Sequence, residues 1–328
     1  MRVKFLVTGG AGYIGSITVR ELLDAGHAVT VLDTLEKGHR SAVDPRATLV
    51  VGDVGDRLAL SRAMPGCDGV LHCAGYIEVA ESQAQPERYF DNNVTRPAVM
   101  LEVMAELGIS ALVFSSTAAV YGEPQVIPIA EDAALAPVNA YGESKLRFER
   151  LIAAGAASHG LRAVVLRYFN VAGAWPDGSL GEAHTPETHI IPRILRNLAA
   201  GQARFEVYGD DYPTPDGTCV RDYIHVCDLA RAHRLALERV GAGGPGITCN
   251  LGNGDGYSNL QVVSACSRVA GREVDVTVGP RRAGDPARLV ASSAPAQAQL
   301  KWTPLRPSLD DIVADAWRWH QAHPDGLL

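Results

Sequence analysis

Tyr141 and Lys145 are the two side chains of this 328-residue chain whose types and spacing best suit proton-transfer chemistry. They lie four residues apart in a helical stretch, so they share one face and are one turn apart. A free tyrosine has a pKa of about 10 and is a poor base at neutral pH. A nearby ammonium group favours the phenolate, which allows Tyr141 to act as a general base.

Thr117 extends this hypothesis to a third residue. It stands in the segment Phe-Ser-Ser-Thr at residues 114–117, which ends an expected strand upstream of the pair. A hydroxyl at the carboxyl end of a parallel strand faces the ligand crevice of an α/β sheet. The spacing Y-x-x-x-K is common by itself, and it is also typical of a solvated helix face. The strand-end hydroxyl upstream of it is what favours a catalytic site.

A glycine-rich loop follows the first apolar strand and opens a helix. Its glycines at positions 9, 12 and 15 allow a tight turn, close approach of the backbone to a pyrophosphate, and close packing of helix on sheet. The amino end of the helix adds free N–H donors and the positive end of a dipole. The order of strand, glycine loop, helix and second strand predicts a dinucleotide site.

Asp33 indicates which dinucleotide is bound. It ends the second strand, 18 residues after Gly15, where a carboxylate can accept hydrogen bonds from the adenosine ribose and repel a 2′-phosphate. This favours NAD over NADP, and a helix-capping or turn aspartate is the alternative. Asp53, after the third strand, could bond the adenine edge, but a purely structural role for it is an equal alternative.

Short apolar runs alternate with amphipathic stretches through the first half of the chain. This alternation predicts an α/β fold with a doubly wound parallel sheet of the Rossmann type. The strands look apolar throughout, as buried parallel strands do. We expect strands at residues 3–7, 28–32, 48–51, 69–72, 111–114 and 163–167, and helices at residues 12–25, 58–64, 91–107 and 141–159.

The second half has a looser pattern. Loops rich in Gly, Pro and Asp lie at residues 173–186 and 209–217, and a last amphipathic helix is expected at 309–320. Such loops often carry binding groups on a rigid scaffold. We expect residues 1–170 to form the NAD-binding domain. Residues 171–328 would form mainly a smaller C-terminal substrate domain, with some segments returning to the first.

Composition limits the partners of the chain. A formal net charge of -7 gives no bulk attraction for nucleic acid or an anionic membrane. No apolar run approaches the roughly 20 residues that span a bilayer, and no signal peptide is apparent, so a cytoplasmic enzyme is expected. The six cysteines match no zinc spacing, and His225 and Cys227, in an expected strand at 223–226, lack a second ligand pair. No metal site is predicted.

These motifs together resemble the short-chain dehydrogenase/reductase superfamily, and the length places the chain in its extended subclass. From residue 1 to about 320, the chain is similar to the UDP-glucose/UDP-galactose 4-epimerase family. The stretches that carry this resemblance are VTGGAGYIGS at 7–16, DNNV at 91–94, FSSTAAVYG at 114–122, RYFN at 167–170, YGDDYP at 208–213, DGTCVRDYIHVCDL at 216–229 and NLG at 250–252.

The resemblance implies the roles of the catalytic residues. Tyr141 would remove the proton of the C4 hydroxyl of a UDP-hexose while hydride passes from C4 to NAD. Lys145 would bond the nicotinamide ribose and, with the nicotinium cation, lower the pKa of Tyr141. Thr117 would bond the C4 oxygen and relay its proton. The 4-keto sugar would then rotate and take the hydride back on its other face, so NAD would stay bound.

The resemblance also implies two sets of binding residues. Asn170 would hold the diphosphate or sugar, Tyr208 would stack on uracil, and Arg221 and Arg282 would neutralise the diphosphate. Asp285 would contact the ribose or the sugar. The cofactor set is Gly9, Gly12, Tyr13, Ile14, Gly15, Asp33, Thr34, Asp53, Val54, Ala74, Asn93, Ser115, Tyr141, Lys145 and Tyr168, and the substrate set is Thr117, Asn170, His189, Ile190, Tyr208, Arg221, Arg282, Asp285 and Leu289.

Two positions depart from the pattern of some family members. Ile77 falls where some members carry a lysine near the nicotinamide, which puts one cofactor contact in doubt. Leu289 falls, seven residues after Arg282, where some members carry tyrosine and others cysteine. There it would limit the room around C2 of the sugar, unless it is an ordinary core leucine.

Three other functions compete with UDP-hexose epimerisation. A sugar-nucleotide dehydratase needs an acid pair beside the strand-end threonine, but Ala118 and Ala119 follow Thr117. A non-catalytic NAD-binding regulator usually lacks the tyrosine or the lysine. The same chemistry on UDP-GlcNAc, UDP-glucuronate or a UDP-pentose is poorly separated by sequence.

A homodimer is expected by family resemblance. The helical stretches at 91–107 and 141–159 would pair with their copies through small and apolar residues, namely Val99, Leu101, Val103, Leu151, Ile152 and Ala153. The alternative is that these side chains face only their own sheet.

Overall fold

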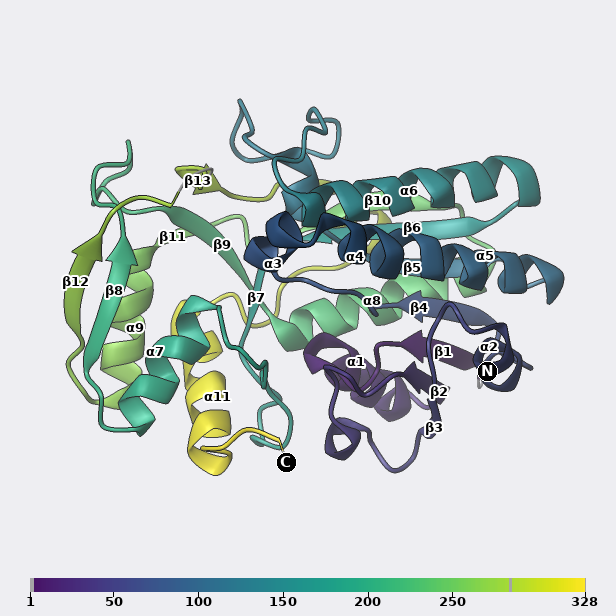
Figure 1. Ribbon diagram of the computed structural model, residues 1–328, viewed down its shortest axis with the longest axis horizontal. Coiled ribbons are helices and arrows are strands. Elements are labelled where there is room, and N and C mark those ends of the chain that lie inside the picture. The colour runs from purple at the N-terminus through teal and green to yellow at the C-terminus, as the bar shows by residue number, and fades with distance from the viewer. Residues whose placement is uncertain (1–2, 283–284, 328) are drawn as a thin grey trace.

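A computed structural model describes residues 3–282 and 285–327, and within them seven parallel strands form the central sheet in the order β10-β6-β5-β4-β1-β2-β3 (Figure 1). Each neighbouring pair is parallel. The doubly wound α/β fold is therefore confirmed. The strands are β1 (Lys4–Thr8), β2 (Ala28–Asp33), β3 (Thr48–Val51), β4 (Gly69–His72), β5 (Ala111–Thr117), β6 (Arg162–Tyr168) and β10 (Ile247–Leu251).

Helices cover both faces of this sheet because successive strand residues point to opposite sides. Phe5 and Val7 of β1 pack into one core with α1 (Tyr13–Asp24), α8 (Val226–Gly241) and α10 (Ala294–Leu300). Leu6, between them, packs into a second core on the other face. The helices of that face are α2 (Arg57–Ala63), α5 (Arg96–Glu106) and α6 (Ala140–His159).

Local rules account for the ends of the helices that flank the site. The side chain of Asn139 accepts a hydrogen bond from the N–H of Gly142 and caps α6, and Gly160 ends the helix in the left-handed conformation. A π-helical turn (Asp91–Thr95) precedes α5. The expected single helix at 91–107 is therefore two elements with different hydrogen bonding.

Three expectations need correction. Strand β3 is half-exposed rather than buried, because it lies at the edge of the sheet. Val226 does not end a strand but begins α8, because the side chain of His225 caps that helix. Val103 and Ile152, expected at a dimer contact, are buried in the protomer's own core.

A smaller lobe is formed mainly by residues after β6 and stands on the left of Figure 1. Its four-stranded sheet joins β7 (Asn170–Ala172), β9 (Val220–His225), β11 (Gly256–Ser258) and β13 (Arg288–Leu289). A parallel pair joins β8 (Arg204–Tyr208) and β12 (Asp275–Gly279). A separate core packs α7 (Ile190–Ala199), α9 (Asn259–Ala270) and α11 (Leu309–Ala322) together.

The chain crosses between the two lobes more than once. After β9, helix α8 returns to the central sheet, and β10 pairs with β6 at its edge. Two short helices, α3 (Val79–Ala84) and α4 (Pro86–Phe90), follow β4, and the 3-10 turns η1 (Arg40–Ala42) and η3 (Ala118–Tyr121) follow β2 and β5. In the described residues, no helix has both the length and the apolar character needed to cross a bilayer.

Candidate active site

A cavity of about 1440 Å³ lies between the two lobes. One wall consists of the glycine loop and the carboxyl ends of the central strands, and the other of residues 181–189 and the segment around Arg282 and Leu289. Pockets for one small ligand typically enclose about 300–1,000 Å³. The volume is therefore suited to two ligands that meet inside it.

The glycine loop allows no side chain at two of its three predicted glycines. A Cβ on Gly15 would lie 2.1 Å from the carbonyl oxygen of Gly9. Gly9 has a φ of +70°, and a Cβ there would lie 2.6 Å from the backbone nitrogen of Ala74. Gly12 is the N-cap of α1 and has no side chain to cap the first turn. The amino end of α1 therefore faces the cavity with N–H donors suited to a pyrophosphate.

Asp33 lies at the end of β2 against this loop. Its carboxylate accepts hydrogen bonds from the backbone N–H of Ala11, at 2.9 Å, and of Leu35, at 2.8 Å. It is buried and still lines the cavity, so its remaining lone pairs are available to ribose hydroxyls. Tyr13, Ile14, Thr34, Val54 and Ala74 line the same wall, as expected.

Asp53 also lines the cavity, but its carboxylate is largely engaged by the protein. One oxygen accepts a hydrogen bond from the N–H of Gly55 at 2.7 Å, and the other pairs with Arg96 at 2.6 Å. The glycine loop, the amino end of α1 and Asp33 together fit an adenine dinucleotide such as NAD. Asp53 has a structural role through Gly55 and Arg96, whether or not it also contacts the adenine base.

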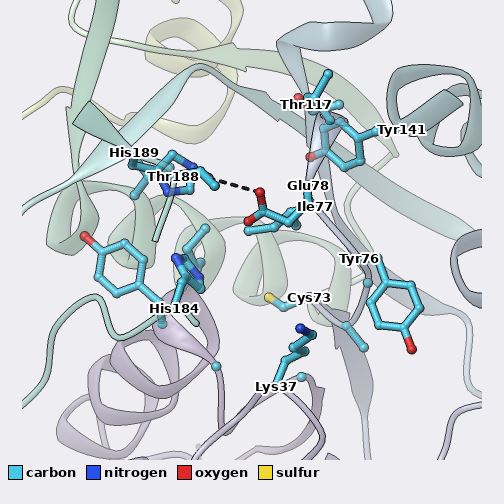
Figure 2. A pocket seen from close by; sticks show the side chains of 18 of the residues that line it. Lys37, Cys73, Tyr76, Ile77, Glu78, Thr117, Tyr141, His184, Thr188 and His189 are labelled. Carbon is cyan, nitrogen blue, oxygen red and sulfur yellow. Dashed lines mark hydrogen bonds between the residues drawn. The ribbon is translucent and has the colours of Figure 1, made fainter. Parts of the chain in front are cut away.

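Tyr141 and Thr117 meet deep in the cavity (Figure 2). Tyr141 stands in the first turn of α6, Thr117 ends β5, and the two side chains lie near enough for the Thr117 hydroxyl to affect the pKa of Tyr141. Burial raises the pKa of Tyr141 to about 12, although the nearby hydroxyl of Thr117 acts in the opposite direction. In the protein alone, Tyr141 therefore keeps its proton, and a positive charge placed beside it is needed to make it a base at neutral pH.

Lys145 is held one turn further along α6. Its Nζ donates a hydrogen bond to the carbonyl oxygen of Ser115 at 2.9 Å. Burial lowers the pKa of Lys145 to about 8, whereas Cys73 and Glu149 act in the opposite direction. The ammonium form still dominates at neutral pH, so Lys145 can both donate hydrogen bonds and favour a nearby phenolate.

Two of the predicted cofactor residues act from behind the cavity wall. Among the described lining residues, neither Ser115 nor Asn93 is present, whereas Tyr168 is. Ser115 bonds His233 through its hydroxyl at 2.7 Å and positions Lys145 through its carbonyl. Asn93 accepts a hydrogen bond from the backbone N–H of Tyr76 at 2.9 Å and donates one to its carbonyl at 3.0 Å. Both residues therefore position their neighbours.

The predicted substrate residues also divide into two groups. Asn170, His189, Arg282, Asp285 and Leu289 line the cavity, whereas Ile190, Tyr208 and Arg221 are not among its described lining residues.

The two predicted diphosphate arginines differ in their surroundings. Arg221 is buried and donates hydrogen bonds to Asp285 at 2.7 Å and to the carbonyl of Pro286 at 2.8 Å. The guanidinium of Arg282 lies 4.1 Å from the centre of the Tyr208 ring. Arg221 therefore supports the segment that follows Arg282, and Arg282 is the arginine directly exposed to a ligand.

Sequence reasoning missed several residues that line the cavity, among them Lys37, Cys73, Glu78 and Thr188. Figure 2 shows the hydroxyl of Thr188 bonded to the carboxylate of Glu78, at 3.0 Å, across the cleft between the lobes. Ile77, beside Glu78, is partly exposed and also lines the cavity. A contact between residues 110 positions apart leaves no local pattern in the sequence.

Comparison with known proteins places this architecture among enzymes that bind NAD. The model of the NAD dependent epimerase/dehydratase family matches residues 5–252. A UDP-glucose 4-epimerase of Lacticaseibacillus casei is 51% identical over 323 residues, which cover 98% of each chain. The crystal structure of UDP-glucose 4-epimerase from Brucella ovis in complex with NAD is 44% identical, with a TM-score of 0.94 over 97% of this chain and 98% of that one.

A further solved relative extends the range of bound sugars. UDP-glucose-4-epimerase from Stenotrophomonas maltophila, with bound NAD and formylated UDP-arabinopyranose, is 40% identical, with a TM-score of 0.94 over 98% of both chains.

Proposed function

Because this chain belongs to the NAD dependent epimerase/dehydratase family, we propose that it interconverts UDP-galactose and UDP-glucose by inverting the configuration at C4 of the sugar. The observation that carries the proposal is that Tyr141 and Thr117 lie next to each other in the lining of a cavity large enough for two ligands. The glycine loop and Asp33 hold NAD on one wall. The second wall is left for a nucleotide sugar.

Bound NAD supplies a hydride acceptor and donor, so that C4 is oxidised and then reduced on its opposite face. The residues of the chain supply the matching proton transfer. The hydroxyl of Thr117 accepts a hydrogen bond from the C4 hydroxyl and takes its proton while giving its own proton to the phenolate of the nearby Tyr141. On the return step, Tyr141 gives the proton back through the same pair.

The charge state of Tyr141 depends on cations beside it. Burial alone raises its pKa to about 12, which would leave almost no phenolate at neutral pH. The ammonium of Lys145 and the positive charge of oxidised nicotinamide both favour the phenolate. The site thus develops its base when the oxidised cofactor is bound.

The UDP end of the substrate needs local positive charge, since the chain carries a formal net charge of -7. We assign Arg282 to the diphosphate, because a guanidinium matches phosphate oxygens in a bidentate geometry. Arg221 supports this group by fixing Asp285 and Pro286. Asn170, at the start of β7, offers an amide to the diphosphate or the sugar.

UDP-GlcNAc is the second substrate that a specific observation favours. Leu289 lines the cavity, where a smaller side chain than tyrosine leaves room around C2. UDP-glucuronate and UDP-pentoses are further candidates. A dehydratase is disfavoured, because the residues after Thr117 are Ala118 and Ala119 and offer no acid.

Incubation of the purified protein with a panel of UDP-sugars, without added cofactor, tests the proposal. We expect UDP-galactose and UDP-glucose to reach equilibrium from either side, and chromatography after denaturation to release NAD. A protein that releases no nicotinamide nucleotide and requires added NADP would contradict the cofactor assignment. Accumulation of a dehydrated sugar would contradict the epimerase assignment.

We also propose that the chain forms a homodimer through α5 and α6. Leu151 on α6 and Leu107 at the end of α5 are exposed, and the two helices run side by side (Figure 1). Light scattering at micromolar concentration should give twice the mass of one chain. Leu151→Arg should reduce that mass, and Leu305→Arg, at an exposed site outside these helices, should not. A monomeric wild type would contradict the dimer.

A cytoplasmic location is supported by the state of the cysteines. All six lie in the described ranges and are free thiols, which suits a reducing compartment.

A further inference from the structure

Four metal-ligating side chains converge in the segment that closes the cavity opposite the glycine loop. They are Glu182, His184, Glu187 and His189, and one possible ligand atom from each lies within 4.8 Å of all the others. Figure 2 shows the rings of His184 and His189 on the same wall of the cavity. All four residues come from eight consecutive positions, 182–189, that precede α7.

The spacing of these atoms matches a small coordination shell. Both histidines direct Nδ1 toward Oε1 of Glu182, at 3.1 Å for His184 and 2.8 Å for His189. Nδ1 of His184 lies 3.7 Å from Oε2 of Glu187, and Nδ1 of His189 lies 3.2 Å from Oε1 of the same carboxylate. In a tetrahedral zinc site with bonds of about 2.0–2.2 Å, neighbouring ligand atoms lie about 3.3–3.6 Å apart. The four measured distances bracket that range.

Hydrogen bonding within the protein satisfies this cluster only in part, since one oxygen of Glu182 and one of Glu187 each meet a histidine Nδ1. Oε2 of Glu187 is buried and has no hydrogen-bond partner among the described residues. The side chains of Glu182 and Glu187 are only 5% and 4% exposed, so water cannot readily compensate. A buried carboxylate oxygen without a partner is costly, and in native proteins it calls for an explanation. A cation at the centre of the four atoms provides one.

We propose that Glu182, His184, Glu187 and His189 bind one divalent transition-metal ion of the zinc class in a structural site. Imidazole nitrogen and carboxylate oxygen suit such ions, and four protein ligands leave no open position for catalysis. Two carboxylates neutralise the charge of a divalent ion, so the complete site is uncharged. No metal site is predicted from the sequence, so this proposal differs from that expectation. It also assigns Nδ1 of His189 to the metal ion, whereas the sequence-based expectation assigned His189 to the substrate.

The position of the cluster indicates what the ion does. The ring of His184 stands edge-on to Tyr13 of the glycine loop, with ring centres 6.2 Å apart. The hydroxyl of Tyr13 donates to the carbonyl of Gly173 at 2.7 Å, and His39 bonds the carbonyl of Ala183 at 3.0 Å. An ion that fixes residues 182–189 therefore fixes the wall that these contacts join to the cofactor site.

The competing interpretation is a pair of imidazolium–carboxylate contacts without metal. Burial opposes the charged imidazoles, but Glu182 and Glu187 hold the pKa of His184 and of His189 above the ordinary value. Protons and a metal ion would then occupy the same place. Metal content distinguishes the two interpretations directly, and it does not depend on whether the chain is an epimerase.

The first experiment measures zinc retained by tag-free protein. The protein is stripped with a chelator, equilibrated with zinc chloride and dialysed, and its zinc is counted by mass spectrometry. We expect about one zinc per chain in the wild type and in His159→Ala, a control at the end of α6. Competition with a chromophoric chelator should show zinc binding weakened more than about 100-fold in Glu187→Gln and His184→Ala, beyond the 10–100-fold typical of outer-shell changes. If the wild type retains no zinc, or if all variants retain as much zinc as the wild type, the proposed metal site is wrong.

The second experiment locates the ion without any variant. Anomalous scattering at the zinc absorption edge, from crystals of the wild type, should give one peak between the four side chains. A peak elsewhere, or none, would overturn the assignment even if the variants fail to fold. Zinc should also raise the Tm of the wild type and of His159→Ala, but not that of Glu187→Gln, because only an ion bound to the folded state stabilises it.

Discussion

The two walls of the cavity are built in different ways. The wall from Gly9 to Gly15 is one continuous loop whose residues are dictated by its own backbone, since a Cβ on Gly15 would strike the carbonyl of Gly9. The opposite wall, residues 181–189, and Gly173, which precedes it in the chain, are held by partners far away in the sequence. Tyr13 bonds Gly173, His39 bonds Ala183, and Thr188 bonds Glu78.

This difference explains why the first wall carries a motif and the second does not. A backbone clash excludes side chains at fixed spacing, and such an exclusion is visible in the sequence alone. A hydrogen bond across a cleft requires only a donor on one side and an acceptor on the other. Many residue pairs meet that condition, so chemistry on the second wall becomes recognisable only when the fold brings the partners together.

The largest effect should follow from removal of the base that the first half of the chain provides. We expect Tyr141→Phe to lower epimerase turnover by about 10²–10⁴-fold, the usual contribution of a general acid–base group. Binding of UDP-sugar, measured by calorimetry, should remain nearly unchanged, because the ring keeps its shape. Tyr257→Phe in β11, outside the cavity lining, is the matched control. Turnover close to that of the wild type in Tyr141→Phe would remove Tyr141 from the mechanism.

The second effect separates two glycines of the same loop. Gly15→Ala places its Cβ 2.1 Å from a backbone oxygen, whereas Gly12→Ala places its Cβ 3.4 Å from the same atom, an ordinary contact. We expect Gly15→Ala to lower the free energy of unfolding by about 1–3 kcal/mol or more, as overpacking does, and to reduce bound NAD. Gly12→Ala should fold with nearly wild-type stability. Equal unfolding midpoints in urea would show that backbone exclusion does not define this wall.

The sequence was sufficient for the parts of the fold that obey local periodicity. Six of the seven strands of the central sheet lie where the apolar runs placed them, whereas β10 and the helices α8 and α10 were not predicted. The glycine loop, Asp33 and Thr117 all line the cavity. Residues that act through a neighbour could not be identified in the same way. Ser115 holds Lys145 through a carbonyl, and Asn93 holds the backbone of Tyr76. Neither arrangement depends on a repeat in the sequence.

The two predicted arginines illustrate the same limit. Both are predicted diphosphate ligands, and in the structure Arg221 is buried and contacts Asp285 and Pro286, whereas Arg282 lines the cavity. Burial is a property of the assembled lobe. The residue type alone does not reveal it.

The third effect concerns the choice of sugar on the second wall. Leu289 lines the cavity on β13, so a larger side chain there should reduce the room around C2. We expect Leu289→Tyr to lower kcat/KM for UDP-GlcNAc relative to UDP-galactose by about 1–3 kcal/mol, or roughly 10–200-fold. Leu289→Met, of similar volume, should leave the ratio nearly unchanged. Equal loss of both activities in Leu289→Tyr, or no UDP-GlcNAc turnover in the wild type, would show that another residue limits the sugar.

The smallest effect should come from the hydrogen bond that joins the two walls. Thr188→Val keeps the shape of the side chain and removes the hydroxyl that donates to Glu78. Because this contact is exposed, water can solvate the carboxylate of Glu78 in the variant. The lost stabilisation is therefore only the net contribution of one hydrogen bond, about 0.5–1.5 kcal/mol. We expect KM for the UDP-sugar to rise about two- to tenfold with little change in kcat, since the bond positions a wall and does not contact the reacting atoms. Thr188→Ser retains the hydroxyl and should behave like the wild type. If steady-state kinetics instead show kcat falling in Thr188→Val while KM stays constant, the contact acts on the chemical step and the second wall is more than a cover.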